Sequence, residues 1–132
     1  MDVPKGLKYH EDHLWIKIEG DRGRVGITDF AQDQLGEILN VELVRVGIQV
    51  KRGTPMGIIE SSKAAYYVPA PVSGEILEIN EILIHQPYWI NQDPYGKGWM
   101  ILLKMTSPEE LGALMSDEQY LHYILGRREK SI

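Results

Sequence analysis

One lysine of the sequence stands in a run of small residues, where it could serve as a covalent attachment point. Lys63 lies in the segment Glu60-Ser61-Ser62-Lys63-Ala64-Ala65, which interrupts an apolar pattern typical of strands. A lysine that carries a tethered group must project from a rigid turn, have small neighbours that an enzyme can approach, and need no structural ion pair. A solubilising lysine at a hairpin tip or sheet edge would look the same, so the segment alone leaves both interpretations open.

The residues on both sides of this segment predict the rigidity that such a role needs. Residues 56–60 read as a strand that leads into the segment. The exit, Pro69-Ala70-Pro71-Val72-Ser73-Gly74, is stiff because its two proline rings fix φ and neither proline donates a ladder hydrogen bond. Lys63 is therefore expected at the tip of a stiff hairpin.

Other residues that could do chemistry form no recognisable active site. The cluster His10-Glu11-Asp12-His13 offers metal-binding atoms, but its place at a strand entrance does not aim both imidazole rings at one point, which favours a solvated turn. The absence of cysteine excludes a disulfide, a thiolate metal site and a thiol nucleophile. Gly96-Lys97-Gly98 lacks the rest of a phosphate-binding loop, and no nucleophile-elbow motif is present. The protein is not expected to be an enzyme.

Composition restricts the remaining function classes. The 132 residues carry a formal net charge of −5, and 43% of them are apolar, which fits one ordinary globular domain. An acidic balance argues against binding to a nucleic-acid backbone, which needs clustered lysine and arginine. The start of the chain has no apolar signal core, and no apolar run is long enough to span a membrane. We expect a cytoplasmic monomer with no nucleic-acid or membrane partner.

The hydrophobic pattern predicts short strands followed by helices. Strands are expected at 14–19, 24–27, 38–46, 56–60, 75–80 and 99–104, with an irregular loop at 85–98. Thr28 or Asp29 caps a short helix that ends at Gly36. Two capping boxes begin helices near 108–115 and 117–127, before a frayed tail at 127–132: Ser107 with Glu110, and Ser116 with Gln119. The prediction is one mainly β domain, residues 1–132, with a β body at about 7–105 and a helical cap at about 107–127.

Several motifs in a fixed order identify a family resemblance. From about Leu7 to Ile124 the sequence resembles the H protein of the glycine cleavage system, a lipoyl carrier. The resemblance is carried by six stretches: Val25-Gly26-Ile27-Thr28-Asp29-Phe30-Ala31-Gln32, Gln34-Leu35-Gly36-Glu37-Ile38, Val41-Glu42-Leu43, Glu60-Ser61-Ser62-Lys63-Ala64-Ala65, Ala70-Pro71-Val72-Ser73-Gly74-Glu75-Ile76 and Asp93-Pro94-Tyr95-Gly96-Lys97-Gly98-Trp99. It implies a lipoyl-type barrel-sandwich hybrid with a short internal helix and C-terminal helices, and lipoate attached covalently to Lys63.

The same resemblance separates this chain from other carriers. Biotin carriers usually place methionine on both sides of their lysine, where this chain has Ser62 and Ala64. Lipoyl domains of 2-oxo acid dehydrogenases usually show an acidic residue before the lysine. The resemblance implies that Glu60, Ser61, Ala64 and Ala65 form the surface that a lipoate ligase or lipoyl transferase reads.

The family resemblance also implies the partners and the chemistry. The expected role is to shuttle an aminomethyl group and reducing equivalents between the P, T and L proteins of glycine cleavage, the last being a dihydrolipoyl dehydrogenase. A reduced lipoyl arm has two thiols that exchange with disulfides through thiolate attack. The lack of cysteine fits this role, because a carrier with its own thiols would capture its own arm.

Three positions depart from the family pattern and leave the client pathway open. Leu14 and Tyr67 stand where acidic residues are usual, and Gln34 stands where histidine is frequent. We expect these residues to border the cleft in which the arm rests, and an apolar cleft suits an uncharged or sulfur-carrying arm. The alternative is therefore a lipoate-binding protein of heterodisulfide-reductase-like sulfur oxidation. An unmodified H-like adaptor is a further alternative.

Overall fold

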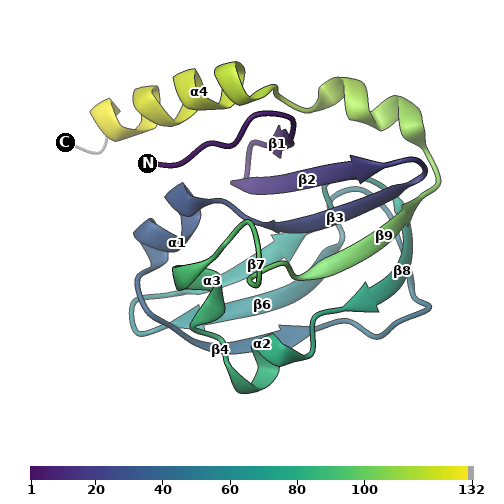
Figure 1. Ribbon diagram of the computed structural model, residues 1–132, viewed down its shortest axis with the longest axis horizontal. Helices are drawn as coiled ribbons and strands as arrows, with labels where there is room; N and C mark the ends of the chain where they lie inside the picture. Colours follow the sequence, from purple (N-terminus) through teal and green to yellow (C-terminus); the bar gives the residue numbers. More distant parts are fainter. Residues whose placement is uncertain (131–132) are drawn as a thin grey trace.

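The computed structural model describes residues 1–130, with side chains up to residue 126, and within this part of the chain the strands form two antiparallel sheets (Figure 1). In spatial order, the larger sheet contains β1 (Lys8–His10), β2 (Leu14–Glu19), β3 (Arg22–Ile27), β9 (Ile101–Met105), β8 (Gly74–Ile79) and β5 (Gln49–Val50). The smaller sheet contains β4 (Ile38–Leu43), β6 (Pro55–Ser61) and β7 (Ala65–Pro69), with β6 in the centre. The predicted strands are present, although their ends differ by a few residues.

The main hydrophobic core lies between the two sheets. The larger sheet contributes Ile16, Val25 and Leu103, and the smaller sheet contributes Ile59 and Val68; all five side chains are buried. Each strand turns alternate residues toward this shared core. The mainly β sandwich expected from the sequence is confirmed, with two facing sheets rather than one closed barrel in the described residues.

A second, aromatic core lies on the other face of the larger sheet. Trp15 is only 1% exposed and packs in one cluster with Tyr9, Phe30 and Tyr120, the last from α4 (Asp117–Lys130). The rings of Tyr9 and Tyr120 stack at a centroid distance of 4.7 Å. In the sequence, Leu14, Ile16 and Ile18 alternate with Trp15, Lys17 and Glu19, a pattern typical of a half-buried strand, which predicts Trp15 on the solvent side. That prediction is wrong for Trp15, because the loop that holds Pro94 and Tyr95 packs on this face together with α4 and the N-terminal segment.

The helix α1 (Asp29–Leu35) begins and ends where the sequence predicted. Thr28 is its N-cap, and the Thr28 hydroxyl oxygen accepts a hydrogen bond of 3.2 Å from the backbone N–H of Ala31. Gly36 follows the last residue with φ +76° and ψ −156°, a conformation that other residues rarely adopt. The chain therefore turns sharply at Gly36 into β4.

Two short helices lie at the stretch 85–98 that was predicted to be an irregular loop: one ends where this stretch begins, and the other lies inside it. They are α2 (Ile82–His85) and α3 (Trp89–Gln92). α3 packs against α1, and α2 packs against β4. Leu83 of α2 and Ile90 of α3 are buried in the main core and anchor the two helices there.

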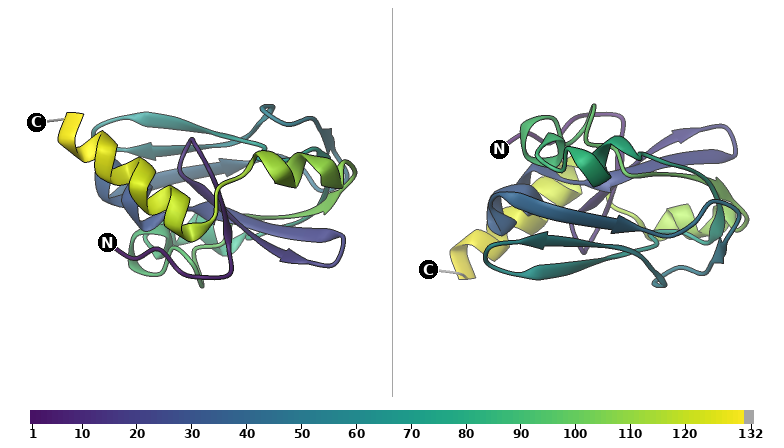
Figure 2. Two further views of the ribbon diagram at one scale, coloured as in Figure 1. Left: turned by 90° about the horizontal axis from the view of Figure 1, so that it is seen from above. Right: turned by 90° about the horizontal axis from the view of Figure 1, so that it is seen from below.

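Two helices were predicted in the C-terminal cap, near 108–115 and 117–127. The first is a shorter 3-10 helix, and the second is the α-helix α4. Pro108–Ala113 forms a 3-10 helix, and α4 extends to Lys130, so most of the predicted tail at 127–132 is helical, while residues 131 and 132 lie outside the described residues. The reciprocal bonds of a capping box form between Ser116 and Gln119, at 2.9 and 3.2 Å. Seen from above, α4 runs diagonally over the end of the molecule where the N-terminus lies (Figure 2).

Candidate functional site

The β6–β7 hairpin presents Lys63 at one end of the smaller sheet, at the left of Figure 1. Glu60 pairs with Ala65, and the turn between them bonds to itself. The Ser61 backbone N–H donates to the Ala64 carbonyl at 2.9 Å, and the Ser61 hydroxyl oxygen accepts from the backbone N–H groups of Lys63 and Ala64, both at 3.2 Å. Because the turn satisfies its own polar groups, no other element has to hold it.

The side chain of Lys63 is exposed and makes no ion pair with any described side chain. The ion pairs found among the described residues, His10 with Asp12 and Lys17 with Glu19, do not involve it. The end of the lysine lies over Gly36: an ideal Cβ built on that glycine would be 3.7 Å from Cε and 3.8 Å from Nζ of Lys63. An exposed amine without a structural partner can be acylated without breaking a contact that stabilises the fold.

The residues predicted to guide a modifying enzyme surround this amine. Ala64 and Ala65 are exposed, and Ser61 is half-buried in the turn. Glu60 is also exposed, and its carboxylate accepts a hydrogen bond of 2.9 Å from the Asn40 side-chain amide on β4. The hairpin therefore offers small side chains next to Lys63 and one oriented carboxylate at its base.

The three residues predicted to border an arm cleft lie in different environments. Leu14 is 0% exposed, because it begins β2 with its side chain on the inner face and packs in the main core. Tyr67 is 62% exposed and lies on the opposite, outer face of the smaller sheet, in a row with Glu42 and Ile58. Gln34 is exposed on α1. The prediction that Leu14 lines a surface cleft is wrong.

Tyr66, the neighbour of Tyr67, points inward, and the sequence reasoning gave it no role. Its hydroxyl donates a hydrogen bond to the backbone carbonyl of Asp12, in the turn between β1 and β2. Burial, with a smaller contribution from the Asp12 charge, raises the pKa of Tyr66 above its usual range, so this hydroxyl keeps its proton. Tyr66 thereby ties the lysine hairpin to the larger sheet. Strand alternation, which places Tyr66 and Tyr67 on opposite faces, was the signal that could have shown this.

The histidine cluster has a structural role. A ring nitrogen of His10 accepts a hydrogen bond of 3.0 Å from the Asp12 backbone N–H, and a ring nitrogen of His13 lies 2.9 Å from the Tyr120 hydroxyl. No group of three or more potential ligands suited to a metal ion occurs in the part of the chain that the structure describes. The same part contains no helix with the length and apolar character needed to cross a membrane.

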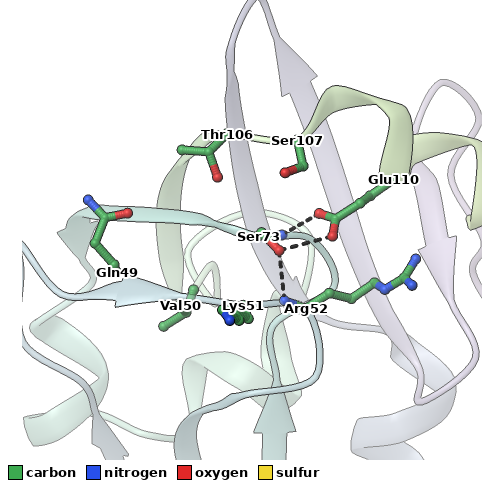
Figure 3. Close-up of a pocket in the computed structure, with 8 residues that line it drawn as sticks. All are labelled: Gln49, Val50, Lys51, Arg52, Ser73, Thr106, Ser107 and Glu110. Carbon is green, nitrogen blue, oxygen red and sulfur yellow. Dashed lines mark hydrogen bonds between the residues drawn. The ribbon is translucent and has the colours of Figure 1, made fainter.

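A polar pocket of about 550 Å³ lies at the far end of β6 from Lys63 (Figure 3). The Glu110 carboxylate accepts hydrogen bonds from the Ser73 backbone N–H at 2.6 Å and from the Ser73 hydroxyl at 2.9 Å. The Ser73 hydroxyl oxygen also accepts from the backbone N–H of Arg52 at 2.9 Å. The predicted capping box of Ser107 with Glu110 is therefore wrong, since Ser107 makes no side-chain cap and Glu110 bonds elsewhere. On the wall of this pocket, Glu110 and Ser73 are thus engaged in a structural contact with each other.

Comparisons with known proteins agree over most of the chain. A family model described as "Glycine cleavage H-protein" matches residues 7–126. A glycine cleavage system H protein of Carboxydothermus hydrogenoformans is 50% identical over 118 residues, which is 89% of this chain and 91% of that protein. The Bacillus subtilis protein of the same name is 43% identical over 120 residues, 91% of this chain and 94% of the relative. A crystal structure of a glycine cleavage system H protein from Mycobacterium marinum superposes with a TM-score of 0.74 and 36% identity, covering 84% of this chain and 98% of that one.

Proposed function

The chain belongs to the glycine cleavage H-protein family, and from this premise we propose that it is a carrier whose lipoyl arm is attached to Nζ of Lys63. The observation that carries the proposal is the place of Lys63, exposed at the tip of a self-bonded hairpin and unpaired with any described side chain. The family places its lipoyl group on the lysine of this same Glu-Ser-x-Lys-Ala segment. Residue type, position and exposure thus agree.

The residues around Lys63 fit an acylated lysine. Acylation replaces the ammonium by a neutral amide, and no ion pair among the described residues is lost. When attached, lipoate supplies a cyclic disulfide that is reduced and reoxidised by thiol–disulfide exchange. The protein's own contribution is to hold the attachment point rigidly, so that the arm reaches each partner at a high effective concentration. The chain has no cysteine that would compete for the arm.

We assign the hairpin surface of Glu60, Ser61, Ala64 and Ala65 to recognition by a lipoate ligase or lipoyl transferase. The exposed alanines leave room for an enzyme to approach Lys63, and Asn40 orients the Glu60 carboxylate. The client enzymes are the P, T and L proteins, and the chain itself has a carrier role without catalysis, as a cytoplasmic monomer. The formal charge of −5 fits transient docking that weakens with salt.

The structure weakens the sulfur-oxidation alternative. That alternative depended on an apolar cleft formed by Leu14 and Tyr67, but the first is in the core and the second is on an outer face. The relatives that match most of the chain are named as glycine cleavage proteins. We therefore propose glycine cleavage as the client pathway.

Intact mass separates a lipoylated carrier from an unmodified adaptor. The purified chain is incubated with a lipoate–protein ligase, lipoate and ATP, and we expect one lipoyl increment. Lys63→Arg keeps the positive charge and should show none, whereas the matched control Lys97→Arg should be modified like the wild type. An unmodified wild-type chain, or a Lys63→Arg variant that is still modified, contradicts the proposal.

Reconstitution tests the pathway. The lipoylated chain is combined with the P, T and L proteins, and release of carbon dioxide from glycine is measured. We expect turnover with the wild type and none with Lys63→Arg. A chain that is fully lipoylated but gives no turnover contradicts the glycine pathway while leaving the carrier role intact.

A further inference from the structure

A pocket of about 590 Å³ lies where the C-terminal cap meets the body of the sandwich. Its lining comes from the end of β1, from the loops before β6 and β8, from the link between the 3-10 helix and α4, and from α4 itself. None of the hairpin residues 60–65 lines it. The volume falls within the range of small-molecule sites. We call it the cap pocket.

Two side chains of opposite charge line the cap pocket without pairing with each other. Arg52 and Glu11 are both exposed, and neither makes an ion pair with a described side chain. In Figure 3 the Arg52 side chain extends to the right, while its backbone N–H bonds to Ser73. A cation and an anion that share one pocket and do not neutralise each other can each bind the complementary group of a third molecule.

His10 adds a hydrogen-bond donor to the same pocket. Its Nδ1 accepts a hydrogen bond of 3.0 Å from the Asp12 backbone N–H, so in the neutral ring the proton is on Nε2. Arg52 and His10 therefore both offer N–H groups, which suit a carboxylate. Glu11 offers acceptor oxygens, which suit an ammonium group.

The remaining lining of the cap pocket is mostly apolar. Leu114 packs against the main core, and Met115 packs against the aromatic core, so each turns only part of its side chain to the pocket. Pro71 is buried behind them in the lining. Charged groups beside an apolar wall suit a ligand that has a charged head and an apolar body.

The walls of the cap pocket are held in place before anything binds. Tyr9 and Met115 exchange two backbone hydrogen bonds, each of 2.8 Å, which fix the link before α4 to β1. The Tyr123 hydroxyl on α4 donates a hydrogen bond of 3.0 Å to the Glu11 carbonyl. A preformed pocket costs less ordering when a ligand enters it.

We propose that the cap pocket binds a small zwitterion, an α-amino acid with an apolar side chain. Arg52 and His10 bind the carboxylate, Glu11 binds the ammonium group, and the apolar side chain lies against Leu114 and Met115. A ligand with only one of the two charges leaves either Arg52 or Glu11 without its partner and binds more weakly. This site goes beyond the carrier role, because it uses no residue of the lysine hairpin. A ligand that contacts both the cap and the body stabilises the folded chain by mass action.

Titration of the unmodified full chain with L-leucine, followed by backbone amide chemical shifts, tests the site. We expect saturable shifts at Glu11, Arg52 and Met115. The analogues 4-methylpentanoate, which lacks the ammonium group, and 3-methylbutylamine, which lacks the carboxylate, should bind about tenfold more weakly, because each loses one charge-assisted contact. The absence of saturable shifts with L-leucine, or equal binding of either analogue, overturns the inference.

Substitutions of the two charged residues locate the binding groups. Arg52→Gln and Glu11→Gln should each weaken L-leucine binding about tenfold. Lys51→Gln is the matched control, since Lys51 is the exposed cation next to Arg52 and does not line the cap pocket, and it should bind like the wild type. Thermal unfolding gives a second measurement: L-leucine should raise the Tm of the wild type and of Lys51→Gln more than that of Arg52→Gln. Wild-type affinity in Arg52→Gln, or an equal loss in Lys51→Gln, contradicts the proposed site and leaves the lipoylation of Lys63 unaffected.

Discussion

Two charged residues lie near the opposite ends of β6, the central strand of the smaller sheet, and they differ in what they contact. Near its C-terminal end, Lys63 projects from a turn that bonds to itself, and its charge has no partner among the described side chains. Beyond its N-terminal end, Glu110 reaches across to Ser73 and accepts two hydrogen bonds there (Figure 3). One charged group is available to other molecules, and the other stabilises the fold.

The difference follows from how each loop satisfies its backbone. The Lys63 turn needs only the Ser61 hydroxyl to bind its exposed N–H groups. At the other end, the segments before β6, before β8 and after β9 meet, and the Ser73 backbone N–H donates to the Glu110 carboxylate. A buried donor without an acceptor is costly, so Glu110 is recruited from the cap. A turn that is self-sufficient leaves its charged residue free for function.

The strongest test of this comparison is removal of the Glu110 carboxylate. Glu110→Ala should lower the free energy of unfolding by about 1–3 kcal/mol, since Ser73 loses the acceptor of both its hydrogen bonds. Urea unfolding followed by circular dichroism measures this. Glu109→Ala, the neighbouring exposed glutamate, is the matched control and should change stability by less than about 0.5 kcal/mol. Equal effects of the two substitutions would show that the Ser73 contact does not stabilise the fold.

A smaller loss of stability is expected near Lys63, from substitution of the uncharged residue Gly36. Gly36→Ala should cost about 1–2 kcal/mol, because alanine is strained at φ +76° and ψ −156°. The control is Gly126→Ala within α4, where alanine should stabilise by about 0.5–1 kcal/mol. Thermal unfolding of both variants checks the opposite signs. A neutral Gly36→Ala would show that the turn into β4 tolerates other backbone conformations.

Ser61→Ala should have a modest effect on stability and a clearer one on modification. It removes the acceptor of two exposed backbone N–H groups, which costs about 0.5–1 kcal/mol. The hairpin tip then becomes more mobile, and we expect slower lipoylation in a timed intact-mass assay. Ser62→Ala, also at the exposed tip, serves as the control. If both serine variants are lipoylated at the wild-type rate, the internal bonding of the turn is not what makes Lys63 a substrate.

The smallest expected effect on stability comes from substitution of Lys63 itself. Lys63→Met keeps the aliphatic length and removes the charge, and it should alter the free energy of unfolding by less than about 0.5 kcal/mol. Urea unfolding of this variant beside Glu110→Ala compares the two ends directly. A loss as large as that of Glu110→Ala would mean that Lys63 has a structural role, and the comparison would fail.

Local signals in the sequence predicted the local structure well. Thr28 and Gly36 mark the ends of α1, and Ser116 with Gln119 caps α4, because each of these depends on neighbours within a few residues. The hairpin around Lys63 was predicted for the same reason. The family resemblance then added the overall sandwich, which the two facing sheets confirm.

Contacts between segments far apart in the sequence account for the predictions that were wrong. Trp15 is buried in the aromatic cluster, where its indole N–H donates to the Pro94 carbonyl and its ring lies near Tyr95, and no feature of β2 alone indicates this. Ser107 and Glu110 have the spacing of a capping box, but Ser73 competes for the carboxylate from a different loop. Likewise, only the folded chain brings Gly36 under the end of Lys63.

The central position of β6 has a mechanical consequence for anything tethered at its end. β6 is paired on both sides, by β4 and by β7, and the ladder hydrogen bonds lie across the strand direction. A pull on Lys63 along the strands therefore loads these bonds together, in shear, instead of unzipping them singly. An enzyme that draws the side chain toward a deep active site pulls against the stiffest direction of the smaller sheet.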